Sequence, residues 1–133
     1  MPTSIIIALV ALLVALVCYS VGTWGAFRRR GFTARLVSVL WVALIADALA
    51  TVMMGLSVGG LDLRPGAPVL HTVLAIFAML GMFLATASGT YAVVSADDAV
   101  GRLWSRVIVV PWALWVGVFV WGMITRGAAR MGG

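Results

Sequence analysis

Four long apolar runs dominate this sequence. Each run contains at most one aspartate or histidine. Each run is long enough for a helix to cross a bilayer, which takes about 17–25 apolar residues, and a helix satisfies its own backbone hydrogen bonds in lipid. The runs predict spans at about residues 5–27, 36–59, 69–94 and 107–125. We therefore predict an all-α fold, namely an integral membrane four-helix bundle with antiparallel up-down order and short loops. It forms a single membrane domain over residues 1–133.

Composition agrees with lipid as the main solvent. Of the 133 residues, 64% are hydrophobic and only 10% are charged, whereas a soluble domain carries about a quarter charged residues. The lipid bilayer is therefore the predicted partner of most of the surface. Arg28, Arg29 and Arg30 follow the first apolar run instead of preceding it, which predicts a retained helix and not a cleaved secretory signal.

All nine basic residues are arginines, and they gather at the ends of the apolar runs. This is the pattern of membrane topology signals, so the net charge of +5 does not indicate nucleic-acid binding. The predicted first and third loops hold Arg28, Arg29, Arg30, Arg35, Arg102 and Arg106, and the other side holds Arg64, Arg126 and Arg130. Positive charge favours the cytoplasm, which predicts a multi-pass protein of the cell membrane with both termini outside.

Asp47 is the only acidic residue inside a predicted span. It lies eleven residues after Leu36, so roughly 16 Å along the helix and close to the bilayer centre. A charge there costs at least about 2.5 kcal/mol, so the group needs a partner or stays protonated. Two interpretations are open: a proton, ion or ligand site, or a protonated carboxyl that is bonded inside the bundle. The candidate partners are Tyr19, Thr51, Thr86 and Ser88.

His71 begins the third span, near the predicted outer surface. It is either a satisfied interfacial residue or a ligand. Met53, Met54 and Met123 fall at a similar level and would suit Cu(I), or a His/Met haem. The alternative is that these methionines fill gaps between helices. Met82 cannot share a haem with His71, because eleven residues separate them on one helix.

Few groups are available for acid–base catalysis, since the chain has one histidine and four acidic residues. An enzyme is therefore disfavoured. Two pairs of small residues, Gly55 with Gly59 and Ala85 with Gly89, allow close helix packing within the bundle or self-association. Between the third and fourth spans, residues 95–106 predict a short surface helix with Ser95 as its N-cap.

Five short motifs are distinctive: Tyr19-Ser-Val-Gly-Thr-Trp24, Trp41-Val-Ala-Leu-Ile-Ala-Asp47, Thr51-Val-Met-Met-Gly55, His71-Thr-Val-Leu-Ala-Ile76 and Trp112-Ala-Leu-Trp115. Together they resemble the HsmA family of small four-span prokaryotic membrane proteins. The resemblance implies that Asp47 and His71 match polar positions of that family. Where family members carry further histidines, this chain has Met82 and Trp104. The family has no established activity, so the resemblance implies no reaction.

The sequence is compatible with three functions. The first is handling of protons or a small solute at Asp47, which would require oligomerisation if a transport path is needed. The second is a non-catalytic accessory subunit of a larger membrane complex. The third is a haem- or copper-binding redox protein that uses His71 and methionine ligands.

Overall fold

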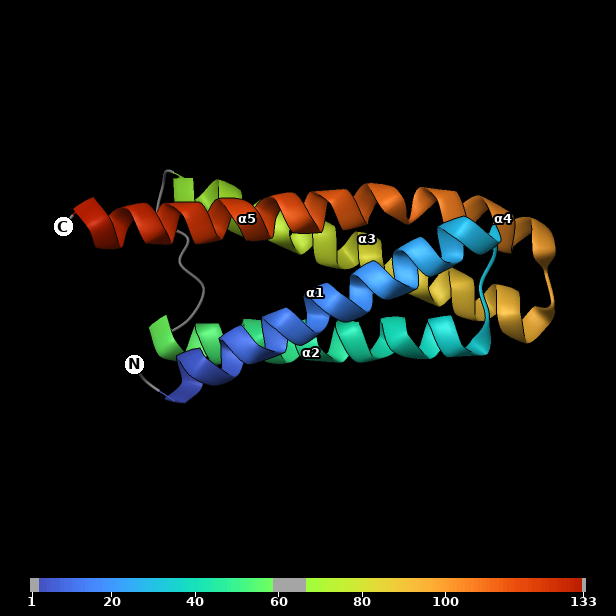
Figure 1. The fold of residues 1–133 in the computed structure, drawn as a ribbon, viewed down its shortest axis with the longest axis horizontal. Coiled ribbons are helices and arrows are strands. Elements are labelled where there is room, and N and C mark those ends of the chain that lie inside the picture. Colours follow the sequence, from blue (N-terminus) through green and yellow to red (C-terminus); the bar gives the residue numbers. More distant parts are fainter. Residues whose placement is uncertain (1–2, 59–66, 133) are drawn as a thin grey trace.

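The fold is a bundle of long helices, which confirms the predicted all-α four-helix class. The computed structural model describes the backbone of residues 3–58 and 67–132, and side chains within 6–53 and 70–124. The helices are α1 (Thr3–Arg29), α2 (Ala34–Val58), α3 (Ala67–Ser95), α4 (Asp98–Val107) and α5 (Val109–Gly132). Figure 1 shows the long helices running alternately up and down, so that α1 begins and α5 ends at the same end of the bundle.

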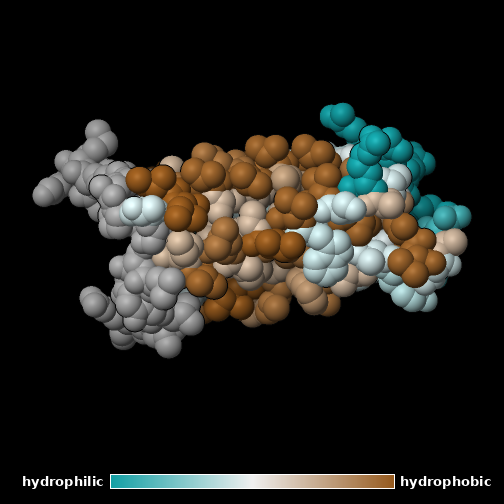
Figure 2. All heavy atoms as spheres, turned by 90° about the horizontal axis from the view of Figure 1, so that it is seen from below, coloured by the Kyte–Doolittle hydropathy of each residue, from teal (hydrophilic) through white to brown (hydrophobic). Residues whose placement is uncertain are grey.

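The surface of the bundle is suited to lipid. Within the described residues, four helical stretches are long and apolar enough to cross a membrane: Ile6–Arg29, Ala34–Met53, Leu70–Ser95 and Asp98–Ile124. Large hydrophobic side chains point outward, among them Ile45 at 68% exposure and Phe77 at 61%. Figure 2 shows hydrophobic residues around the middle of the molecule and hydrophilic ones at one end. We call that end the arginine end; it holds Arg28, Arg29, Arg30, Arg35, Arg102 and Arg106.

Small residues bring α1 and α2 close together. A Cβ atom on Gly22 would lie 2.5 Å from a methyl carbon of Leu40, and one on Gly25 would lie 2.6 Å from a methyl carbon of Leu36. Both helices also carry small buried residues, namely Ala8, Ala11, Ala15, Ala26, Ala43, Ala46 and Ala50. Helices in lipid associate largely through such close packing, because no hydrophobic force drives them together there.

A second close contact joins α3 to α5. A Cβ atom on Gly81 would lie 2.7 Å from the Cβ atom of Pro111. Further along α3, Ala85 is fully buried, and a Cβ atom on Gly89 would lie 2.8 Å from the ring of Phe32. The Ala85–Gly89 pair therefore packs inside the bundle. The other predicted pair cannot be placed, because Gly55 and Gly59 fall outside the described side chains.

The short helix α4 differs in one detail from the prediction. Its N-cap is Asp97, whose carboxylate accepts a hydrogen bond from the backbone N–H of Val100 at 3.2 Å. The prediction of Ser95 as the cap was wrong, because α3 continues through Ser95. Helix α4 is amphipathic, with Gly101 and Ser105 buried and Arg102 exposed.

Pro111 explains the break between α4 and α5. A proline ring clashes with the carbonyl four residues earlier, which here belongs to Val107, the last residue of α4. Helix α5 then begins at Val109, after a single turn residue, Ile108. The backbone bonds from Ile108 N–H to Trp104 and from Trp112 N–H to Ile108 keep the two helices nearly continuous.

Helices α1 and α3 end in the same way at the arginine end. Arg30 and Ala96 have positive φ angles of 57° and 54°. In each case the following N–H bonds a carbonyl five residues earlier: Gly31 to Ala26 at 3.1 Å, and Asp97 to Ala92 at 3.0 Å. This is the Schellman ending, whose left-handed position usually holds glycine. Both helices thus place a side-chain-bearing residue in a disfavoured backbone conformation.

Candidate functional site

Asp47 lies in the middle of α2 and inside the bundle. It is thirteen residues from the start of α2 at Ala34, so roughly 20 Å along the helix, and only 5% of its surface is exposed. Two side chains donate hydrogen bonds to its carboxyl. The Tyr19 hydroxyl lies 3.0 Å from Oδ2, and the Trp115 indole nitrogen lies 3.1 Å from the same oxygen. We call Asp47, Tyr19 and Trp115 the Asp47 cluster.

The two donors hold each other in place. The rings of Tyr19 and Trp115 meet edge to face, with centroids 5.2 Å apart and an interplanar angle of 70°. Trp115 also stacks on Phe119, with centroids 5.6 Å apart. Tyr19 and Met82 are fully buried in the same core. The cluster therefore draws on α1, α2 and α5, and aromatic packing fixes the direction of both donors.

No positive charge balances Asp47 among the described residues. The described arginines belong to the arginine end, and no described arginine lies within ion-pair distance of this carboxyl. Both partners are neutral donors aimed at Oδ2. A carboxylate can accept both bonds at that oxygen, and so can a carboxylic acid whose proton is on Oδ1. The arrangement therefore accommodates both protonation states without moving a partner.

The structure brings together only part of the predicted site. Tyr19 reaches the Asp47 carboxyl as the similar depth of the two residues predicts. Thr51 instead donates to the backbone carbonyl of Asp47 at 2.9 Å, and Thr86 donates to the carbonyl of Met82 at 2.7 Å. Both are ordinary bonds to the carbonyl four residues earlier in a helix. No hydrogen bond from Ser88 to the carboxyl is found among the described residues.

Sequence reasoning missed Trp115 as a partner of Asp47. An indole N–H in the middle of a membrane span needs an acceptor, and Asp47 is the acidic group at that depth. That signal was available in the sequence. What the sequence did not show is the rotation of α5 that turns Trp115 inward and leaves Val110 70% exposed.

Two other indoles are also satisfied within the bundle. Trp41 donates to the hydroxyl of Thr90 at 2.9 Å, and Trp112 donates to the hydroxyl of Ser20 at 3.1 Å. Trp112 further packs edge to face on Trp24, with centroids 5.3 Å apart. These bonds join α2 to α3 and α1 to α5, so the two rings help to set the packing of the helices.

His71 lies against α5. Its Nε2 atom is 3.2 Å from the carbonyl oxygen of Val118, and its ring packs edge to face on Trp121 with centroids 5.7 Å apart. Of the predicted methionine ligands, Met53 is partly buried and Met123 is 51% exposed, while Met54 lies outside the described side chains. The described residues contain no group of three or more His, Cys, Asp or Glu suited to a metal ion. A copper or haem site at His71 stays a prediction.

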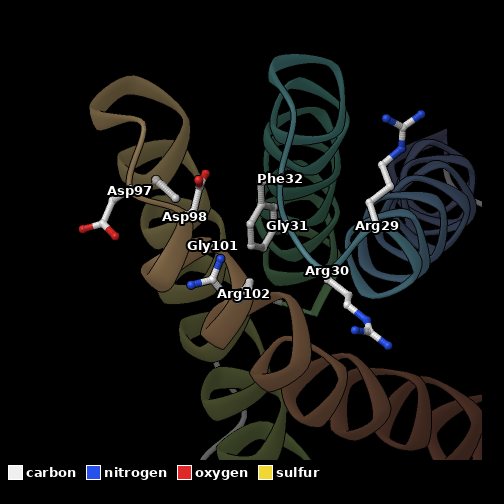
Figure 3. A pocket seen from close by; sticks show the side chains of 9 residues that line it. Arg29, Arg30, Gly31, Phe32, Asp97, Asp98, Gly101 and Arg102 are labelled. Atoms are coloured by element: carbon white, nitrogen blue, oxygen red, sulfur yellow. The ribbon is translucent and has the colours of Figure 1, made fainter.

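A pocket opens at the arginine end, between the end of α1 and helix α4 (Figure 3). Its volume is about 360 Å³. The lining residues are Arg29, Arg30, Gly31, Phe32, Ala92, Asp97, Asp98, Gly101 and Arg102. Figure 3 shows the side chains of Arg29 and Arg30 extending away from Phe32. The guanidinium groups of Arg29 and Arg30 therefore do not converge on one anion. The pocket is best described as a polar opening.

Comparisons with known proteins found no matching family model, no matching curated protein and no matching solved structure.

Proposed function

We propose that this protein is a non-enzymatic membrane protein that binds and releases protons at Asp47. The observation that carries the proposal is the pair of neutral donors, Tyr19 and Trp115, on a single oxygen of a buried carboxyl. A residue of this kind inside a membrane is costly, and such residues usually mark a path for protons or ions. The cluster supports proton binding because Oδ1 can gain or lose a proton while Oδ2 keeps both bonds.

A proton suits this site better than a small solute does. Asp47 is buried, and fully buried side chains such as Tyr19 and Met82 pack in the same core. A solute would have to displace those side chains, and displacement from a well-packed interior is unfavourable. A proton needs no such space. Packing thus favours a proton over a small solute as the species that binds at Asp47.

We further propose that the arginine end faces the cytoplasm, so that both termini are outside. The support is the excess of arginine at that end, six residues against three, under the positive-inside tendency. Cysteines introduced one at a time at Gly31 and at Gly133 would report their side through a membrane-impermeant thiol reagent, in a Cys18→Ser background. Gly133 should react in intact cells and Gly31 only after permeabilisation. The reverse pattern would invert the orientation.

We propose in addition that the chain belongs to the HsmA-like proteins. Three residues within the motifs that carry the resemblance, namely Tyr19, Asp47 and Trp115, meet in one cluster. This supports the proposal because residues that share one site are expected to be retained together. Alignment of the chain with HsmA family sequences should show the three residues retained jointly, and independent loss of each would count against membership.

The proton proposal is tested with purified protein in liposomes that contain a pH-sensitive dye, under an imposed potassium diffusion potential. Asp47→Asn keeps the size of the side chain and removes the titratable proton, so it should abolish the proton flux. Asp62→Asn is the matched control, since it removes an acidic group from the α2–α3 connection, and it should leave the flux unchanged. Equal flux in wild type and Asp47→Asn would refute the proposal.

A further inference from the structure

Thr23 on α1 has an unusual hydroxyl. The residue is fully buried, and its Oγ1 is the one buried side-chain nitrogen or oxygen among the described residues that has no hydrogen-bond partner. Thr51, Thr86 and Thr90 all donate to the carbonyl four residues earlier. Thr23 makes no such bond to Tyr19. A buried hydroxyl without a partner is destabilising, so a water bound at this position would be stabilising.

Thr23 lies between the Asp47 cluster and the arginine end. It follows Tyr19 by four residues, so the two lie on one face of α1, roughly 6 Å apart along the helix axis. It precedes Arg29 by six residues, which is roughly 9 Å. Arg29 lines the pocket at the arginine end. A polar group thus stands about midway through the apolar stretch that separates the pocket from Tyr19.

Helix α4, which borders the pocket, carries another buried hydroxyl. Gly101 lines the pocket (Figure 3), and Ser105 follows it by one turn of α4 and is fully buried. The Ser105 hydroxyl donates to the carbonyl of Arg102 at 2.8 Å. Its oxygen keeps lone pairs that can accept a further hydrogen bond. Polar groups therefore continue from the pocket into the bundle on α4 as well as on α1.

We infer that protons reach Asp47 from the arginine end, through the pocket and past Thr23, whose hydroxyl holds a water on the way. This inference rests on the proposed function, because it names the route to the same site. Each oxygen on the route accepts one proton from the pocket side and passes one proton on. The water held by Thr23 passes its proton to Oδ1 of Asp47, while the Tyr19 hydroxyl keeps its own proton and its bond to Oδ2. The net change is one proton lost from water in the pocket and one gained by Asp47.

Thr23→Val tests the route in the liposome flux assay, since valine keeps the shape of threonine and lacks the hydroxyl. We expect the flux to fall about tenfold or more, as removal of one stabilised step predicts. Thr23→Ser keeps the hydroxyl and should keep the flux. Thr86→Val is the matched control, because Thr86 is equally buried and its hydroxyl is already bonded to Met82; it should change the flux less than about twofold. Thr23→Ala repeats the test if the valine variant does not fold.

The outcomes separate the route from the proposed function. If Asp47→Asn abolishes the flux and Thr23→Val or Thr23→Ala leaves it at the wild-type level, the route is wrong and the function stands. An equal loss in Thr23→Val and Thr86→Val would also overturn the route, because it would reflect general damage to packing. If Asp47→Asn leaves the flux unchanged, the function and the route both fail.

Discussion

Trp115 donates its indole N–H to Oδ2 of Asp47 over 3.1 Å, although 68 residues separate the two in the sequence. This bond ties α5 to α2 at mid-depth. With Tyr19 on the same oxygen at 3.0 Å, it leaves the other carboxyl oxygen available to carry a proton.

Trp115→Phe should weaken both the bundle and the proton flux. The change removes one donor from Asp47 and keeps an aromatic ring, so we expect the free energy of unfolding to fall by about 1 kcal/mol. Trp112→Phe also loses one hydrogen bond, to Ser20 at 3.1 Å, and is the matched control. Denaturant titration in detergent micelles should show similar losses of stability for the two variants. Only Trp115→Phe should reduce the flux; an equal reduction by Trp112→Phe would contradict the assignment.

Gly81→Ala should destabilise the contact between α3 and α5. The added methyl would lie 2.7 Å from the Cβ atom of Pro111, a ring atom that cannot rotate away. Overpacking of this kind typically costs about 1–3 kcal/mol. Gly117→Ala is the control, because an added Cβ there meets nothing within 4 Å. It should be neutral, or stabilising by up to about 1 kcal/mol through helix propensity. Thermal unfolding in detergent checks both variants, and an equal stability of the two would argue against this α3–α5 packing.

Ala96→Gly should stabilise the protein by about 1 kcal/mol, because Ala96 has a left-handed φ of 54° that glycine adopts freely. Ala99→Gly, in the exposed face of α4, should instead destabilise by about 1 kcal/mol. The opposite signs can be read from unfolding midpoints measured in the same detergent. A loss of stability in Ala96→Gly would show that α3 does not end in the Schellman geometry.

Copper titration addresses the metal interpretation of His71. Its Nε2 atom is engaged with the Val118 carbonyl at 3.2 Å, and a carbonyl oxygen only accepts, so the contact places a proton on that nitrogen. Anaerobic titration with Cu(I) therefore tests binding through the other ring nitrogen. Binding of one equivalent in the wild type that is lost in His71→Ala would support a copper site, and the absence of stoichiometric binding that depends on His71 would refute it.

The sequence predicted the architecture well because the bilayer leaves few alternatives. Long apolar runs can cross lipid only as helices or as closed barrels, and the arginines mark where the runs end. The position of Asp47 followed from counting along one run. Its pairing with Tyr19 followed from the similar depth of two antiparallel spans.

Details that depend on helix rotation could not be predicted in the same way. Trp115 and Trp112 belong to one apolar run, yet they bond different partners, Asp47 and Ser20. Thr86 is fully buried but is satisfied by its own helix, whereas Thr23 is buried and unsatisfied. Hydropathy treats such pairs alike. The packing of neighbouring helices decides between them, and that packing depends on contacts such as Gly81 on Pro111.

The most direct test of the central claim is infrared spectroscopy of the reconstituted protein, labelled with ¹³C at the aspartate carboxyl carbons and measured as pH is varied. All four aspartates carry the label, and proton exchange at Asp47 predicts that one of the signals that interconvert between carboxyl and carboxylate forms in wild type is missing in Asp47→Asn. The signal should persist in Thr86→Val. If wild type and Asp47→Asn give the same pH-dependent spectra over the range in which both stay folded, Asp47 does not exchange a proton and the account is contradicted.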